Sequence, residues 1–510
     1  MPMPINRRQF LQSSVSAGVI AAGAVSIPKP VDAKPRQLDE FIDHDALGMA
    51  QLIKSKEISR TEAVEIVIRR IEALDPIINA ITTKTYERAL EKAETIPLDS
   101  TFAGMPILIK DMIDVGGVRR TDGSRMNLTN VPAKNVKYID GVESAGMNIL
   151  GMTNVPEFAQ LGIVTNNSAF GVTKNPWDLS KSAGGSSGGA GAAVAAGIVP
   201  LAHGTDGGGS NRYPPCFQGL FGVKPSRARM LPGEADGGHG PFKTNQAISR
   251  TVRDSAALFN ETEDKSGAVF EPVGRVTEPS KRRLKIGYAP DIAGAMQTEP
   301  EVRAVQEATV ALLEDLGHQV EEIAYPLNSA EFFESFTNAF LRQFGFVAGL
   351  AEKISGRSAA QSGLLDPFSA SIIGFGASIT DDQQAQAMEY LKTVPVAYAR
   401  TFESFDLILS PVTPVLSIDA DALKPTDSFN PYTRKFLEDR MSFGAPVNVS
   451  GHCAMSVPLN WAPDTGFPIG SMFQAATGDD RLLYELAFEL EAARPWKDKW
   501  APYSAKYIPV

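Results

Sequence analysis

The chain has 510 residues, of which 43% are hydrophobic and 21% charged, with 44 glycines and 35 prolines. This composition is typical of a folded globular protein and excludes a disordered or fibrous chain. The formal net charge of −10 disfavours a nucleic-acid partner, because proteins that bind nucleic acid present basic surfaces to the phosphates.

Residues 1–33 have the layout of an export signal. The pair Arg7 and Arg8 precedes a mildly apolar stretch over residues 10–27, and residues 31–33 are typical of a cleavage site. Serine and glycine dilute the apolar stretch, so we expect no stable membrane insertion. The layout resembles a twin-arginine signal, which predicts a periplasmic or secreted protein. A disordered leader with a chance arginine pair is the alternative.

From residue 39 to about residue 95 the pattern predicts a docking pair of helices. Ser59 and Glu62 form a predicted capping box. Apolar residues then recur at helical spacing until Asp75 and Pro76, where we expect the helix to end.

The later elements alternate between strand and helix. Residues 105–115 predict a buried strand that ends near Lys110, and "AGMNILGMTNVPEF" predicts a helix end, a short strand and a turn. Residues 190–196 and 199–203 predict a small-residue helix and a strand. The segments from "RLKIGYAP" to "VEEIAYP" predict a βαβ unit. A helix-rich segment and two buried strands, "FDLILSPVTP" and "HCAMSVPLNW", complete one large α/β domain, residues 34–510.

Cysteine and histidine spacing gives no sign of a metal site. Cys216 and Cys453 lie far apart in the sequence, and we expect two buried free thiols rather than a disulfide. None of the five histidines stands in an HxxxH or HExxH arrangement. The sequence therefore predicts neither a metal nor another cofactor.

Glycine is concentrated beside three serines. Residues 184–211 hold ten of the 44 glycines. They flank an Ala/Val-rich helix and a strand, which favours a place inside the fold over a flexible surface loop. Backbone amides can converge on an oxyanion where no side chain blocks the approach. Gly207, Gly208 and Gly209 are therefore candidate oxyanion donors, and Ser210 is the candidate nucleophile.

A serine nucleophile needs a base. His203 is near in sequence, but it lies in the predicted strand and would have to fold back past the loop. Lys110 ends an apolar strand, and burial there would supply the about 4–5 kcal/mol needed to keep its amine neutral at pH 7. A structural pair between Lys110 and Asp111 explains these two residues equally well.

Four segments resemble the amidase signature family: "GMPILIKDMIDV", "GMTNVPEF", "NPWDLSKSAGGSSGGAGAAVAAG" and "GTDGGGSNRYPPCFQGLFGVKPS". The similarity is specific over residues 100–230 and continues more weakly over most of the chain. It implies an α/β fold with one large mixed β-sheet flanked by helices on both faces. It also implies a signature core at about 100–270 and a helix-rich variable region at about 330–400.

The resemblance also implies an activity. Members of the family cleave the C–N bond of an amide, so a small-molecule amide is the expected substrate. "PLAHGTD" is similar to the 6-aminohexanoate-cyclic-dimer hydrolase branch of that family.

The family's Ser–Ser–Lys triad carries over residue by residue. Lys110 corresponds to the base, and Ser186 to the bridging serine that follows a cis peptide bond, here Gly185–Ser186. Ser210 corresponds to the nucleophile that carries the acyl group, 24 residues after Ser186.

Supporting residues carry over as well. Asp206 and Arg212 correspond to a pair that braces the oxyanion loop, and Ser187 supports the bridging serine. Three positions depart from the family pattern: Gly207 stands where the family usually has a larger residue, Asn211 replaces an aliphatic one, and Gln218 replaces a common Cys or Thr. These departures leave the triad intact but leave the substrate open.

Three alternatives remain. "GGSSG" matches the G-x-S-x-G motif of α/β-hydrolases, but we expect no strand in the preceding "NPWDLSK", which that motif requires. An amidotransferase subunit that acts on charged transfer RNA is disfavoured by the export signal and the acidic balance. A non-catalytic binding or scaffold relative is disfavoured by the complete triad.

Overall fold

The structure is a computed structural model that describes Asp39 and residues 41–510. These residues belong to one compact unit. The predicted export signal, residues 1–33, lies outside the described residues.

Eleven strands form one mixed sheet. In order across the sheet they are β1 (Ile81–Lys84), β3 (Asn148–Thr153), β2 (Pro106–Lys110), β6 (Leu201–Asp206), β8 (Thr244–Ser249), β7 (Phe221–Lys224), β12 (Cys453–Trp461), β13 (Pro468–Ala475), β11 (Leu407–Pro411), β9 (Lys285–Tyr288) and β10 (Gln319–Glu322). The pairs β3–β2, β2–β6, β11–β9 and β9–β10 are parallel, and the other pairs are antiparallel. A separate two-stranded sheet joins β4 (Lys174–Asn175) to β5 (Asp178–Ser182).

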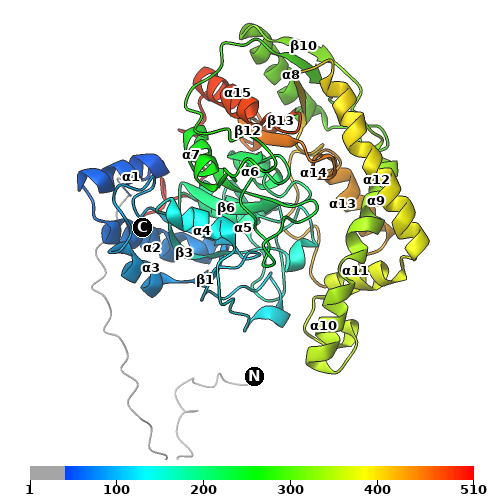
Figure 1. The fold of residues 1–510 in the computed structure, drawn as a ribbon, viewed down its shortest axis with the longest axis horizontal. Helices are drawn as coiled ribbons and strands as arrows, with labels where there is room; N and C mark the ends of the chain where they lie inside the picture. Colours follow the sequence, from blue (N-terminus) through cyan, green and yellow to red (C-terminus); the bar gives the residue numbers. More distant parts are fainter. Residues whose placement is uncertain (1–38, 40) are drawn as a thin grey trace, which may run out of the picture. The chain divides into compact units, whose positions relative to one another are not determined.

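Helices flank this sheet. They are α1 (Ala46–Ser55), α2 (Arg60–Ile78), α3 (Tyr86–Ala93), α4 (Lys137–Ser144), α5 (Gly188–Ala195), α6 (Tyr213–Gln218), α7 (Val252–Thr262), α8 (Pro300–Asp315), α9 (Ser329–Arg342), α10 (Gly345–Ser355), α11 (Pro367–Ser378), α12 (Asp381–Phe402), α13 (Pro431–Arg440), α14 (Gly444–Ser450) and α15 (Asp480–Ala493). In Figure 1, α9 to α12 gather on the side of the body opposite α1 to α3.

Successive residues of the central strands face two different cores. On β13, Phe473 packs in the same hydrophobic cluster as Leu483 of α15. Its neighbour Met472 packs in a second cluster with Leu391 and Val394 of α12. Because side chains alternate along a strand, both faces of the sheet are buried under helices. This confirms the predicted fold class.

The first helices show where the sequence prediction held and where it failed. The capping box of Ser59 and Glu62 is present at the start of α2. Pro76 does not end this helix, which continues to Ile78 and stops at Asn79 in the left-handed conformation, with φ 53°. The Asp75 carboxylate accepts hydrogen bonds from the amides that follow, those of Ala80 and Ile81.

Six strands were not predicted: β1, β4, β5, β7, β8 and β13. The short β1 lies at the edge of the sheet, within the segment that we expected to be helical. The segment before Ser186, expected to contain no strand, includes β5. Because β5 pairs with β4 outside the main sheet, it does not supply the central strand that a nucleophile elbow requires.

Candidate active site

Lys110 is the last residue of β2, every residue of which is buried. This strand pairs in parallel with β3 and with β6, so Lys110 ends inside the sheet rather than at an edge. Its side chain is inaccessible to solvent. Lys110 Nζ donates hydrogen bonds to Ser186 Oγ over 2.8 Å and to the carbonyl of Thr205 over 3.2 Å.

The two serines of the predicted triad are also in contact. Ser186 lies just before α5 after a cis Gly185–Ser186 peptide bond, as the family resemblance implied. Ser186 Oγ donates to Ser210 Oγ over 2.9 Å, and Ser210 lies half-buried in the loop after β6. Lys110, Ser186 and Ser210 therefore form one continuous chain of hydrogen bonds.

Burial favours the neutral form of the Lys110 amine. It lowers the pKa of Lys110 well below its usual value; the charge of Asp206 opposes this shift and that of Lys243 adds to it. No ion pair of the described residues includes Lys110. The neighbouring Asp111 carboxylate instead accepts hydrogen bonds from the hydroxyl groups of Thr82 and Thr121. A structural pair between Lys110 and Asp111 is therefore not formed.

His203 lies within β6 and contacts neither serine. Its Nδ1 accepts the backbone amide of Lys110 over 3.3 Å, and its Nε2 lies 3.3 Å from Asn245 Oδ1. Burial lowers the pKa of His203 to about 3. Both ring nitrogens are thus engaged away from Ser210.

A buried ion pair holds the ends of the loop that carries Ser210. Arg212 donates to both carboxylate oxygens of Asp206, over 2.9 and 3.0 Å, and neither side chain is exposed. Burial alone would raise the pKa of Asp206, but the charge and hydrogen bonds of Arg212 outweigh it and hold that pKa below its usual range. The same carboxylate accepts the amides of Gly209 and Asn211. Asp206 and Arg212 thus brace the loop, as expected.

The contact of Asp206 with Gly209 corrects one expectation. The Gly209 amide donates to Asp206 Oδ1 over 2.7 Å, so it is not free to bind an oxyanion. Within the described part of the chain, the amides of Gly207, Gly208 and Ser210 donate to no acceptor. The candidate oxyanion donors are therefore Gly207, Gly208 and Ser210 itself.

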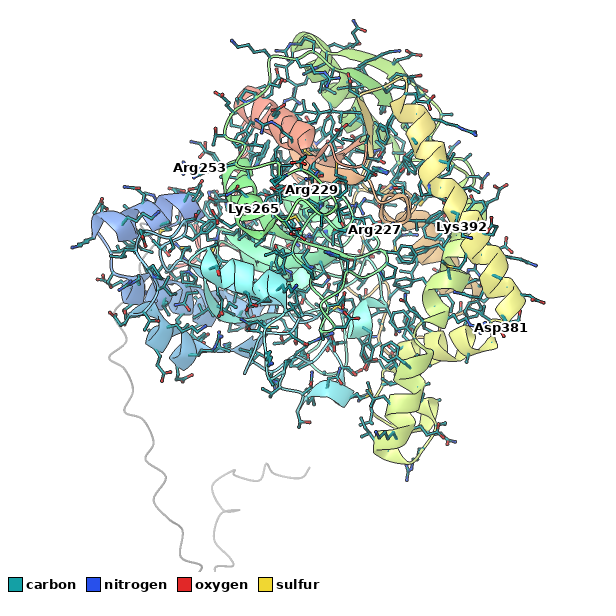
Figure 2. The ribbon with its side chains drawn as sticks, in the orientation of Figure 1. Arg227, Arg229, Arg253, Lys265, Asp381 and Lys392 are labelled. Carbon is teal, nitrogen blue, oxygen red and sulfur yellow. The ribbon has the colours of Figure 1, made fainter. Side chains whose placement is uncertain are left out.

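Asn448 of α14 completes the brace and was not predicted. Its Nδ2 donates to the Asp206 carboxylate over 2.9 Å and to the Asp206 carbonyl over 2.9 Å, and its Oδ1 accepts from Arg212 over 2.6 Å. Arg227, labelled in Figure 2, donates to the Asn448 carbonyl over 2.6 Å. The one available sequence signal was the segment "NVSGHCAMSVP", which shares the family resemblance but does not single out this residue.

Ser187 supports the site without joining the hydrogen-bond chain. Its hydroxyl donates over 3.1 Å to the Thr205 carbonyl, the same oxygen that accepts from Lys110. Cys216 and Cys453 are buried free thiols, as predicted. Among residues 41–510, His, Cys, Asp and Glu side chains form no group of three suited to a metal ion. No helix in the same residues is long and apolar enough to cross a membrane.

Comparison with known proteins identifies the family. The sequence model of the family described as Amidase matches residues 62–484. This chain belongs to the amidase family. The amidase is 35% identical over 476 residues to "Putative amidase AmiC" of Mycobacterium tuberculosis, covering 92% of this chain and 98% of that protein. It is 31% identical over 481 residues to the 6-aminohexanoate-cyclic-dimer hydrolase of Paenarthrobacter ureafaciens, covering 89% and 95% of the two chains.

A solved structure is similar over nearly the same span. The structure of 6-aminohexanoate cyclic dimer hydrolase complexed with substrate has a TM-score of 0.82 and 29% identity, over 91% of this amidase and 99% of that chain. This amidase is therefore a hydrolase that acts on the carbon–nitrogen bond of amides.

Proposed function

We propose that this amidase cleaves a carboxamide through a Ser–Ser–Lys triad, with the acyl group carried transiently on Ser210. One observation carries the proposal: Lys110 Nζ, Ser186 Oγ and Ser210 Oγ are linked by hydrogen bonds of 2.8 and 2.9 Å. Hydroxyl groups both donate and accept, so the chain can carry a proton in either direction.

In the first half of the reaction, Ser210 Oγ attacks the amide carbonyl carbon. Its proton passes to Ser186, whose own proton passes to the neutral amine of Lys110. The carbonyl π electrons move onto oxygen, and the amides of Gly207, Gly208 and Ser210 hold the resulting oxyanion. The C–N bond then breaks, and the leaving nitrogen takes back a proton through Ser186.

In the second half, water attacks the ester on Ser210. The proton of the water follows the same chain to Lys110, and the carboxylate product leaves as Ser210 Oγ regains a proton. The brace of Asp206 and Arg212 supports this cycle, because it fixes the loop on which both the nucleophile and the oxyanion donors lie.

The proposal is tested by single substitutions and by covalent labelling. Ser210→Ala is expected to abolish turnover, Lys110→Ala nearly so, and Ser186→Ala to cost several orders of magnitude. The matched control is Ser187→Ala, a neighbouring buried serine outside the proton path, which should lose far less. A fluorophosphonate should label Ser210 in the wild-type protein and fail to label Ser210→Ala. Full turnover by Ser186→Ala would contradict proton transfer through Ser186.

A Ser–His mechanism makes a different prediction. In the described structure, His203 and His452 are buried, and their rings contact Asn245, Ser450 and Gln474 rather than the candidate nucleophile. The lysine relay therefore predicts that His203→Gln and His452→Gln keep amide turnover in any variant that folds. A Ser–His enzyme would be inactivated by one of them.

The proposed location is outside the cytoplasm. Arg7 and Arg8 ahead of a weakly apolar stretch support twin-arginine export to the periplasm or medium. Replacing both arginines by lysine should leave the protein in the cytoplasm of an expressing bacterium, as measured by cell fractionation. An unchanged distribution would contradict this.

A further inference from the structure

The entrance to the proposed site lies over Gly207 and Ser210. Across residues 201–224, these two positions are half-buried and every other residue is buried. A Cβ built on Gly207 would meet nothing within 4 Å, so unfilled space borders the backbone there. The open space beside Gly207 therefore offers an approach to Ser210 Oγ.

Met441, which follows α13, borders the same loop with an apolar side chain. A Cβ on Gly208 would lie 3.5 Å from Met441 Cε, and a Cβ on Gly162 would lie 2.8 Å from Met441 Sδ. Gly162 in turn packs against Gly185, whose own Cβ would lie 2.2 Å from the Gly162 carbonyl oxygen. The thioether therefore spans the distance between the loop of Ser210 and the segment behind the bridging serine.

The backbone of Met441 is tied to the glycine loop. Tyr213 donates its hydroxyl to the Met441 carbonyl over 3.0 Å, and the Tyr213 ring fills the space beside Gly209. Met441 is half-buried, so part of its side chain remains accessible. A thioether is flexible and polarizable, and it adapts to apolar groups of varied shape.

We propose that Met441 is a specificity-determining residue that packs on the acyl group of the substrate, and that the preferred amides carry an uncharged aliphatic acyl chain. This inference rests on the proposed function. Met441 Cε lies beside the Cβ position of Gly208, a candidate oxyanion donor, so an acyl group on Ser210 Oγ comes within reach of the Met441 thioether. The charges of Asp206 and Arg212 are buried and satisfied by each other, and Lys243 is paired with Glu234, so a charged acyl group would lose its water without gaining an unpaired counter-ion among these residues.

The test is an acyl series with one leaving group. Purified enzyme is assayed with the 4-nitroanilides of acetic, butyric and hexanoic acid, and with the anionic mono-4-nitroanilide of glutaric acid. For wild type, kcat/KM should rise by up to about 4-fold per methylene that Met441 covers and be lowest for glutaryl. Met441→Ala should flatten this dependence, and Met441→Leu, which conserves volume, should restore it. Met441→Lys should favour glutaryl over hexanoyl.

The matched control is Met388→Ala, because Met388 lies on α12 and is 41% exposed. It should keep the wild-type dependence on chain length. If Met441 had only a structural role, Met441→Ala would lower kcat/KM for all four substrates by the same factor and leave their ratios unchanged. That result would overturn this inference but not the proposed function. Absence of turnover together with absence of fluorophosphonate labelling at Ser210 would overturn the proposed function, and this inference with it.

Discussion

The ring of Tyr213 occupies the space where a side chain on residue 209 would lie. A Cβ on Gly209 would fall 2.1 Å from Tyr213 Cε2, and Gly209 has a φ of +120°, which side chains disfavour. Gly207, two residues earlier, has open space around its own Cβ position. The three consecutive glycines therefore differ in how strictly they are required.

Gly209→Ala should distort the loop that carries Ser210, whereas Gly207→Ala should not. We expect Gly209→Ala to lower kcat/KM by about 10²-fold or more, the scale of losing an oxyanion donor, and to lower Tm. Gly207→Ala keeps its backbone amide and should keep a Tm close to wild type, and its methyl group beside the entrance should lower kcat/KM far less than Gly209→Ala does. Thermal unfolding and anilide hydrolysis kinetics of the two variants measure both effects. Equal Tm and equal kcat/KM in the two variants would contradict this prediction.

The lowered pKa of Lys110 predicts the pH dependence of catalysis. The neutral amine is the active form, so kcat/KM for an uncharged amide should rise with pH through the lowered pKa and then stay level. A profile that keeps rising to the ordinary lysine range, near ~10.4, would be inconsistent with a desolvated amine. Lys110→Arg should be inactive at every pH, because a guanidinium does not deprotonate.

Asp206→Asn should be strongly destabilising. It leaves the Arg212 charge buried without a counter-ion, which costs about 3–5 kcal/mol in comparable cases. The control is Lys392→Ala on α12, labelled in Figure 2, because its ion pair with Glu389 is exposed, at 70% and 76%. Such a surface pair contributes about 0–1 kcal/mol. Urea denaturation of both variants gives the comparison, and similar losses would show that the buried pair is not needed.

Glu157 should make the protein less stable as pH rises. It lies in a short 3-10 helix, Glu157–Ala159, and accepts hydrogen bonds from Ser124 and from the amide of Asp366. Burial, with the charge of Asp366, raises the pKa of Glu157 to about 7. The folded state therefore holds this proton more tightly than the unfolded state, and stability falls between about pH 4.3 and pH 7.

Glu157→Gln tests this dependence. The free energy of unfolding of the variant, relative to wild type, should increase from pH 4.5 to pH 7.5, by on the order of 3 kcal/mol at most. Paired urea titrations at the two pH values measure it. A difference that is the same at both pH values would rule out titration of Glu157 in this window.

The sequence sufficed for those parts of the site that depend on local pattern. The buried run "PILIK" indicated a desolvated Lys110 because apolar neighbours precede it on one strand. Three successive glycines pointed to Ser210, because few roles other than a close approach to the backbone favour such a run. The family resemblance added Ser186, which no local pattern distinguishes from Ser187.

Other features depend on contacts between distant segments and could not be read from the sequence. The Gly209 amide is lost as an oxyanion donor only because the Asp206 side chain turns back to accept it. The strand β1 is four residues long, "ITTK", and three of these residues are polar; its pairing with β3 rather than its own composition makes it a strand. Asn448 lies 242 residues from Asp206 in the chain, so no residue near Asn448 in the sequence indicates that it contacts Asp206.

That separation has a consequence for biosynthesis. During translation, the segment with Ser210 leaves the ribosome more than two hundred residues before Asn448 does. The nascent chain therefore contains Ser210 long before it contains Asn448, whose side-chain amide binds the Asp206 carboxylate. We therefore expect catalytic competence only after α14 has been synthesised, and a fragment that stops short of α14 is expected to be inactive.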